Sequence, residues 1–233
     1  MSFREDLEGD LHTHTTWSDG KDPLELMIAE AVRRGYSYYA ICDHSHRLRE
    51  GRLQEQAEAI DALNELVPLQ LLKGIEVNIR ANGEIDVADD DLAGLDWVVA
   101  SVHNSFDTDP TGRVLAAMEN PYVDCIGHLT SRKIGRREPS GVDVERVIEK
   151  ALETGTFLEI NSQPDRMDLS DVHARAAREA GLKLVIDSDG HEVTALGYVE
   201  LGVGQARRAW LTAADVLNTR SWKQIEKLRK PRP

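Results

Sequence analysis

The chain has 233 residues, of which 41% are hydrophobic, and this size and composition suit one large domain with a full core. Its 28 basic and 41 acidic residues give a formal net charge of −13, which disfavours a broad electrostatic grip on a nucleic-acid backbone. No apolar run is long enough to span a membrane and no signal peptide is visible, so we expect a cytoplasmic location.

Short apolar or β-branched runs alternate with helical patterns along the chain. Seven runs are predicted to be strands: 9–14, 38–42, 69–77, 97–102, 123–127, 157–160 and 184–186. Helices are predicted at 23–34, 53–66, 142–153, 170–180, 192–201, 213–217 and 222–228. The acidic segment 84–94 is expected to be a connection.

This alternation favours a parallel sheet with right-handed crossovers. Seven strands in a chain of this length indicate an α/β fold, a (β/α)7 TIM-like barrel with one strand fewer than usual, as a single domain over 1–233. An open doubly wound sheet is the competing architecture. No G-x-G-x-x-G follows the first strand, so a dinucleotide site has no support. Cys42 and Cys125 lie in apolar runs and are expected to be reduced, buried thiols.

Six of the eight histidines stand at or just beyond the end of a predicted strand: His12, His14, His44, His103, His128 and His191. In an α/β barrel the carboxyl ends of all strands open onto one face, so residues far apart in the sequence meet there. Residues two apart in a strand point to the same side, which would aim both histidines of the H-x-H motif at one metal ion.

Three carboxylates occupy similar places: Asp19, Glu76 and Asp189. Each has an ordinary explanation by itself, because Asp19 suits a turn and a buried histidine can simply be hydrogen-bonded in a core. Glu76 ends an apolar run, where an unpaired carboxylate is costly. Together the nine residues predict a multinuclear metal site, and the mixture of imidazole and carboxylate suits Zn, Mn or Fe better than Ca or Mg.

Several such ions a few ångströms apart hold a bridging hydroxide and bind both oxygens of an in-line displacement, which is the chemistry of phosphate-ester hydrolysis. Such an anionic substrate also needs fixed positive groups. The loop that follows His128 offers Arg132, Arg136 and Arg137, which are therefore candidates for substrate binding. The alternative interpretation of this loop is a solvated basic surface.

Seven ordered motifs carry a resemblance: DLHTHTTWSDG, ICDHS, GIEVN, SVH, IGH, LEIN and DSDGH. They resemble the PHP (polymerase and histidinol phosphatase) domain from about Asp10 to His191. The likeness is greatest to the PHP domain attached to bacterial family X DNA polymerases. In those proteins, stretches resembling IGHLTSRKIGRRE and GVGQARRAWLTAADVLNTR extend the likeness almost to the C-terminus.

The resemblance implies a distorted (β/α)7 barrel with up to three divalent metals. His12, His14, Glu76 and Asp189 would hold the first, and Glu76 would bridge to a second, held also by His103 and His128. Asp19, His44 and His191 would hold the third. Glu76 and Asp189 are accordingly predicted to be the catalytic carboxylates. Two departures are noted: some members have histidine at the Asp19 position, and most have proline where Leu129 stands.

Three functions remain open on the residues. The first is a phosphoesterase acting on a nucleotide, a nucleic-acid 3′ end or a small phosphomonoester, with histidinol phosphate as a substrate of one branch of the family. The second is a barrel amidohydrolase acting on C–N bonds, which commonly needs a bridging lysine where this chain has Glu76. The third is a non-enzymatic relic, although none of the nine ligands is missing.

The substrate class is not decided by the charge distribution. The overall acidity favours a small phosphate ester, whereas residues 205–233 carry eight Lys and Arg against two acidic residues and favour a nucleic-acid end. The residues leave open the oligomeric state, and whether the chain stands alone or is part of a longer polymerase-like protein.

Overall fold

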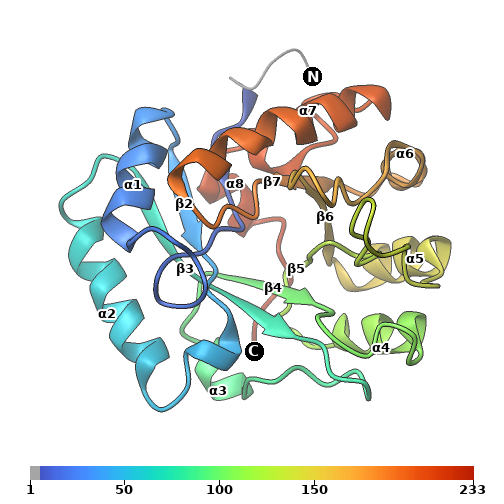
Figure 1. Ribbon diagram of the computed structural model, residues 1–233, viewed down its shortest axis with the longest axis horizontal. Helices are drawn as coiled ribbons and strands as arrows, with labels where there is room; N and C mark the ends of the chain where they lie inside the picture. The colour runs from blue at the N-terminus through green and yellow to red at the C-terminus, as the bar shows by residue number, and fades with distance from the viewer. Residues whose placement is uncertain (1–5) are drawn as a thin grey trace.

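Seven parallel strands form one sheet in chain order in the computed structural model, which describes residues 6–233 (Figure 1). The strands are β1 (Gly9–Asp10), β2 (Tyr38–Ile41), β3 (Gln70–Asn78), β4 (Trp97–Ser101), β5 (Cys125–Ile126), β6 (Phe157–Asn161) and β7 (Leu184–Asp187). Every pair of neighbours is parallel; in β3 and β4, for example, Gly74 lies opposite Trp97 and Asn78 opposite Ser101. All seven predicted strands are confirmed, and the sheet curls into a nearly closed barrel rather than an open doubly wound sheet.

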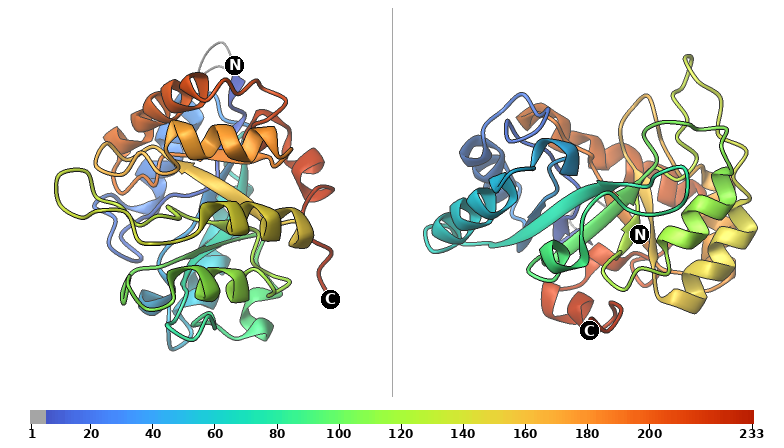
Figure 2. Two further views of the ribbon diagram at one scale, coloured as in Figure 1. Left: turned by 90° about the vertical axis from the view of Figure 1, so that its right-hand side faces the viewer. Right: turned by 90° about the horizontal axis from the view of Figure 1, so that it is seen from below.

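Helices cover the outside of this barrel (Figures 1 and 2). They are α1 (Leu24–Arg33), α2 (Arg52–Asn64), α3 (Asp89–Leu92), α4 (Pro110–Ala117), α5 (Val144–Thr154), α6 (Asp171–Glu179) and α7 (Val199–Arg208). The last helix, α8 (Trp222–Glu226), instead packs against inward-facing side chains of the strands. None of the helices in the described part of the chain is long and apolar enough to cross a membrane.

Some of the helix predictions are wrong. Helix α4 was not predicted, although its N-terminus has ordinary signals: Pro110 lies in the first turn, and the Asp109 carboxylate accepts a hydrogen bond of 3.0 Å from the Gly112 amide. The segment 84–94 contains the single turn α3. Residues 192–201 divide into a 3₁₀ helix, Val193–Tyr198, and the start of α7.

The predicted helix at 213–217 does not form, because this segment lies beside β7. Val216 pairs with Leu184 in a parallel bridge, and the Leu184 amide donates to the Asp215 carbonyl at 3.0 Å. Next to it, Asn218 joins β7 to β1. Its side-chain amide donates to the Gly9 carbonyl at 2.9 Å and the Ile186 carbonyl at 2.7 Å, and its oxygen accepts from the Ile186 amide at 3.1 Å. A side chain thus fills part of the place of a missing eighth strand.

The two faces of the sheet have separate cores, because successive side chains of a strand point to opposite faces. Outward residues such as Val98 and Ala100 pack in one cluster with residues of the helices. Inward residues such as Leu72 and Val99 form a cluster that also contains Trp222 and Ile225 of α8. Both cysteines are free and buried in this inner cluster, as predicted.

The inner cluster positions the functional face. Helix α8 and the C-terminal segment, in red, lie at the opposite end of the molecule from the yellow-green loop after β5 (Figure 2, left). Glu76 shares the inward face of β3 with Leu72, four residues earlier, so its carboxylate stands on top of the apolar interior. The polar side chains at the carboxyl ends of the strands therefore lie directly above the inner apolar cluster.

Candidate metal centre

All nine predicted ligands lie at the carboxyl ends of the strands, and the fold brings them together. Their places are after β1 (His12, His14, Asp19), after β2 (His44), within β3 (Glu76), after β4 (His103), after β5 (His128) and after β7 (Asp189, His191). The strand β1 itself ends at Asp10, so His12 and His14 follow it in a less regular segment in which Thr13 alone bridges to Gly190.

Glu76 is the centre of the group and is fully buried. One of its oxygens, Oε1, lies 3.1 Å from Nε2 of His128 and 3.3 Å from Nε2 of His103. The other, Oε2, lies 2.9 Å from Nδ1 of His44. A carboxylate that faces different imidazoles with its two oxygens has the geometry of a bridging ligand.

A second group of atoms gathers around Asp189. Its Oδ1 lies 3.2 Å from Nε2 of His14 and 3.9 Å from Nε2 of His12. These two nitrogens are also 3.6 Å and 3.5 Å from Oε2 of Glu76. One potential ligand atom from each of His12, His14 and Asp189 lies within 4.8 Å of the others, so a single ion could bind all three.

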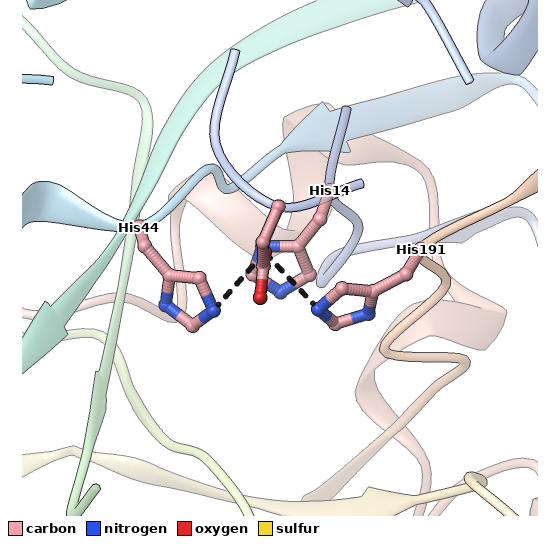
Figure 3. Close-up of side chains that lie close together, drawn as sticks. His14, His44 and His191 are labelled. Atoms are coloured by element: carbon pink, nitrogen blue, oxygen red, sulfur yellow. Dashed lines mark ion pairs between the residues drawn. The ribbon is translucent and has the colours of Figure 1, made fainter. Parts of the chain in front are cut away.

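A third group lies nearer the surface and is shown in Figure 3. His44 and His191 each direct Nε2 toward Oδ1 of Asp19 at 3.4 Å, and His14 lies close behind them. The rings of His14 and His191 are stacked with their centroids 4.1 Å apart. A ring nitrogen of His14 lies within 4.8 Å of the ligand atoms of this group as well as of the second one, so the two groups share a residue and are not separate sites.

The donor atoms fit divalent metal ions. Several are buried and, among residues 6–233, make no hydrogen bond of proper geometry, namely Nε2 of His12, both ring nitrogens of His14, Nδ1 of His44, Nε2 of His103 and Oε2 of Glu76. Nδ1 of His44 and Oε2 of Glu76 face each other at 2.9 Å without such a bond. Leaving buried polar atoms unpaired costs free energy, so their convergence on a few points indicates a bound cation. The chain therefore has the features of a divalent-metal site.

The pKa values of the histidines follow from burial and from the neighbouring carboxylates. Burial lowers the pKa of His14 to about 3 and that of His128 to about 4, so both rings are neutral at pH 7, the form that binds metal. Burial opposes a charge on His44 too, but Glu76 and Asp19 outweigh it and raise its pKa to about 10. A metal ion at that position would displace this proton.

Two residues of β6 orient three of the predicted ligands. Both residues belong to the LEIN motif, to which the sequence assigned no role. Oε1 of Glu159 lies 2.6 Å from Nδ1 of His12, which leaves Nε2 of that ring free to face the site. Oε2 of Glu159 accepts from the His128 amide at 2.6 Å. The Asn161 side chain donates at 3.0 Å both to Glu159 and to Oδ2 of Asp189.

A buried carboxylate shapes the loop that carries Asp19. Asp43 accepts hydrogen bonds from the amide of Thr15 at 2.8 Å and from its hydroxyl at 2.7 Å. It also accepts from the Ser18 hydroxyl, and from the side chain of Gln56 in α2 at 2.7 Å. Asp43 thus connects β2 and α2 to the turn before Asp19, which accounts for the aspartate of the ICDHS motif.

The backbone adopts an uncommon conformation at two of the predicted ligands. His128 and Asp189 have positive φ angles of 27° and 51°, a conformation that ordinary side chains rarely adopt. Gly127, just before His128, packs so closely that a Cβ atom there would lie 2.5 Å from Oγ of Ser101. The glycine of the IGH motif is therefore required for β5 to approach β4.

A cavity of about 550 Å³ opens onto the metal centre. Its basic lining residues are Lys21, Lys133 and Arg166, not the three predicted arginines. Lys133 pairs with Asp165 at 2.9 Å, and Nε of Arg166 lies 3.5 Å from Oδ2 of Asp189. Arg166 thus places a positive charge beside the predicted ligand Asp189, and no motif in the sequence had predicted this residue.

The three predicted arginines have other surroundings. Arg132 donates from Nε to the Arg166 carbonyl at 2.6 Å and from a terminal nitrogen to the Met167 carbonyl. Arg137 donates to the Ser131 carbonyl at 2.8 Å and stacks 3.8 Å from the ring centre of Phe106. Arg136 is exposed. Their part in substrate binding stays a prediction, and for Arg132 the contacts indicate an indirect route through Arg166.

The similarity of this chain to known proteins is consistent with a metal site of this composition. Residues 10–163 match the PHP domain family. Over 230 residues the chain is 42% identical to the DNA polymerase/3′-5′ exonuclease PolX of Bacillus subtilis. This chain belongs to the PHP domain family. The match spans 94% of this PHP domain chain but 40% of the length of PolX.

Two further relatives cover most of their own length. The PHP domain is 31% identical over 231 residues to a protein of Thermoanaerobacter sp. described as a probable phosphatase, covering 90% of this chain and 89% of that protein. It also superposes on histidinol phosphate phosphatase from Lactococcus lactis, solved with zinc, L-histidinol and phosphate. That alignment has a TM-score of 0.63 at 15% identity and covers 85% of this chain and 93% of the other, which confirms the TIM-like barrel.

Proposed function

We propose that this PHP domain is a metal-dependent phosphoesterase, a hydrolase of phosphate esters. The observation that carries the proposal is the convergence of nine candidate imidazole and carboxylate ligands, with Glu76 at their centre, above an apolar interior and beside a cavity that Arg166 lines. Metal ions held by these residues would supply positive charge for the phosphoryl group, and the cavity would accommodate the rest of the ester.

The ligand sets support up to three divalent ions, with Zn, Mn or Fe as candidates. His12, His14, Glu76 and Asp189 would hold one ion, Glu76 with His103 and His128 a second, and Asp19 with His44 and His191 a third. When bound, these ions supply positive charge for the phosphoryl oxygens and activate water for in-line attack. Glu76 and Asp189 are the proposed catalytic carboxylates because they keep the ions in place through negative charge that no neutral side chain provides.

The protein's own groups bind and orient the substrate. Arg166 lines the cavity beside Asp189 and would offer N–H donors to the phosphoryl oxygens, whereas the charge of Lys133 is already paired with Asp165. Arg132 would hold Arg166 in place through its two carbonyl contacts. Arg136 and Arg137 are further from this arrangement, and we retain them only as groups that contribute to the positive potential of the loop.

The names of the relatives suggest the substrate class. A probable phosphatase and a 3′-5′ exonuclease both act on phosphate esters, so phosphomonoesters and nucleic-acid 3′ ends are the substrates we propose. A barrel amidohydrolase is less well supported. The cavity lysines, Lys21 and Lys133, are paired with Glu192 and Asp165, and the central bridging position is Glu76.

The test is a screen of the metal-loaded protein. The substrates would be histidinol phosphate, nucleoside monophosphates, p-nitrophenyl phosphate and 3′-labelled oligonucleotides, with N-acylated amino acids for the alternative. We expect release of phosphate or of nucleotides that a chelator abolishes and added metal restores. Hydrolysis of amides alone, or no phosphoryl release with any of the three metals, would refute the proposal.

A further inference from the structure

A second cavity lies at the rim of the metal centre. Its volume is about 390 Å³, and it is lined by His46, Arg49, Asn78, Arg80, Asp86, His103 and Asn104. His103 lines both this cavity and the larger one, so the two meet at a predicted metal ligand. His46 belongs to the same corner, because its ring centre is 5.3 Å from that of His44.

The charge of this rim cavity is unusual for so acidic a chain. Arg49 and Arg80 are exposed, and among residues 6–233 neither guanidinium forms an ion pair with a carboxylate. The one acidic lining residue, Asp86, accepts hydrogen bonds from the Ser45 hydroxyl at 2.8 Å and from the Asn78 amide at 2.8 Å. The Asn78 side chain donates to it as well, also at 2.8 Å. The carboxylate of Asp86 is therefore occupied by hydrogen bonds to Ser45 and Asn78, and the guanidinium groups of Arg49 and Arg80 face solvent.

The walls of the rim cavity are held by a buried arginine. Arg113, which is 1% exposed, donates to the carbonyls of Ile79 and Arg80 on one wall, the latter at 3.0 Å. It donates to the carbonyls of Asn104 and Ser105 on the other wall, at 2.9 Å and 3.0 Å. Asn78 in the floor also orients His103, since its Oδ1 lies 2.6 Å from Nδ1 of that ring. Arg113 therefore holds both sides of the cavity together, and Asn78 orients the predicted ligand His103 beside it.

We propose that the rim cavity binds a second phosphate group of the substrate, while the ester to be hydrolysed lies in the metal centre. This inference rests on the proposed function. Two guanidiniums without ion-pair partners match a phosphate, which accepts parallel hydrogen bonds from arginine. The shared wall at His103 places this subsite next to the reacting phosphoryl group. The second phosphate could belong to a nucleoside bisphosphate or to the neighbouring link of a nucleic-acid strand.

The experiment compares substrates that differ in the second phosphate. Adenosine 3′-monophosphate has none, adenosine 3′,5′-bisphosphate has one on the same nucleoside, and a dinucleotide 3′-phosphate has one in the strand. The quantity measured is the ratio of kcat/KM for each two-phosphate substrate to that for the monophosphate. We expect Arg80→Gln and Arg49→Gln each to lower this ratio about tenfold for the substrate that fits.

The matched control is Arg146→Gln, which removes the same charge from an exposed position on α5 and should leave the ratio unchanged. If the ratio of kcat/KM between two-phosphate and monophosphate substrates is the same in Arg80→Gln, Arg49→Gln and the unsubstituted protein, the rim cavity does not bind a second phosphate. If the protein hydrolyses none of the substrates, the proposed function fails, and calorimetric binding to the metal-loaded protein tests the subsite alone. Tighter binding of either two-phosphate compound than of the monophosphate, lost in Arg80→Gln, supports it; equal affinities refute it.

Discussion

Glu76 shows what a single side chain contributes to this centre. Its two oxygens face His128 and His103 on one side and His44 on the other, all within 3.3 Å, and the side chain is fully buried. Burial by itself would raise the pKa of such a carboxyl, but the surrounding imidazoles hold it well below its ordinary value. The carboxylate therefore remains charged, as a metal bridge requires.

Replacing this carboxylate tests its role. We expect Glu76→Gln to lower kcat for a phosphate ester by at least about 10²–10³-fold, because an amide lacks the charge and the second strong oxygen needed to bridge two cations. Far-UV circular dichroism should be unchanged. Glu149→Gln, an exposed position on α5, is the control for loss of one negative charge. Near-normal turnover of metal-loaded Glu76→Gln would show that the bridge is misassigned.

Glu159 is a second single residue on which the site depends, although it is not one of the predicted ligands. Its carboxylate fixes the ring of His12 and the amide of His128, so Glu159→Gln should weaken metal binding about 10–100-fold through poorer orientation of these ligands. Competition titration with a chromophoric chelator measures this affinity, again beside Glu149→Gln. Unchanged affinity would mean that the inner apolar packing alone orients His12.

At the scale of elements, the loop between β6 and α6 forms one wall of the cavity and is held by the loop after β5. Arg132 contacts the carbonyls of Arg166 and Met167, and Thr130 donates its amide and its hydroxyl, each at 2.9 Å, to Oδ2 of Asp168. The position of Arg166 in the cavity therefore depends on contacts between the two loops, in addition to the bridge between Asn161 of β6 and Asp168.

The two-loop arrangement predicts a rank order. Arg166→Ala should reduce kcat/KM the most, Arg132→Ala should raise KM by about threefold to tenfold, and Arg136→Ala should have the smallest effect. Losing charge-assisted hydrogen bonds to a carbonyl displaces the loop and its guanidinium without removing any metal ligand, so metal content should stay constant. Steady-state kinetics with metal analysis checks this. Loss of metal in Arg132→Ala would contradict a role confined to the substrate wall.

Asp168 should give these loops a pH-dependent stability. Burial raises its pKa from 3.8 to about 6, although Thr130 and Arg132 oppose the shift. Because the folded state holds this proton more tightly than the unfolded chain, the stability it contributes is complete below about pH 4 and is lost as the pH rises through about 6. The window is thus pH 4 to 6.

Asp168→Asn removes this titration and keeps an acceptor for Thr130. The free energy of unfolding of Asp168→Asn, relative to the unsubstituted protein, should increase by about 3 kcal/mol between pH 4 and pH 7. Denaturant unfolding of both proteins at several pH values measures the difference, in which the titrations of the metal ligands cancel. A difference that does not vary with pH would contradict the expectation.

For the whole molecule, the metal centre joins segments from both ends of the chain. His12 and His14 follow the first strand, and Asp189 and His191 follow the last. The seam where these two strands meet is held in part by the hydrogen bonds of Asn218 and by a bridge between Thr13 and Gly190. A cation bound by residues on both sides of the seam should therefore hold the barrel closed.

Metal binding should accordingly stabilise the folded state by mass action. At a free metal concentration one hundred times Kd, the gain is about 2.7 kcal/mol, which for a chain of this length corresponds to a rise in Tm of about 5–10 °C. Differential scanning calorimetry of chelator-treated protein, with and without Zn or Mn, measures it. Glu76→Gln should show a smaller rise, and equal rises in both proteins would place the bound metal elsewhere.

The sequence by itself determined the strands and the fold class of this protein, and it predicted the group of candidate metal ligands that the fold brings together. Apolar runs of strand length, polar residues at their ends and the H-x-H or D-x-H spacing all involve residues that are close together in the sequence, so they can be recognised without the structure. Helix α4 was within reach of the same reasoning through Asp109 and Pro110. The arrangement of His44, which faces Glu76 with one nitrogen and Asp19 with the other, was not.

Only the tertiary structure decided which groups surround the ligands. Glu159 orients a histidine 147 positions away, Arg113 joins two loops of the rim, and Arg166 rather than Arg132 lines the main cavity. The segment before Asn218, expected to be helical, instead lies along β7 because the barrel has a seam to fill. Hydrogen bonds between segments distant in sequence leave no periodic signal, since their energy depends on where the closed barrel places each backbone carbonyl and side chain.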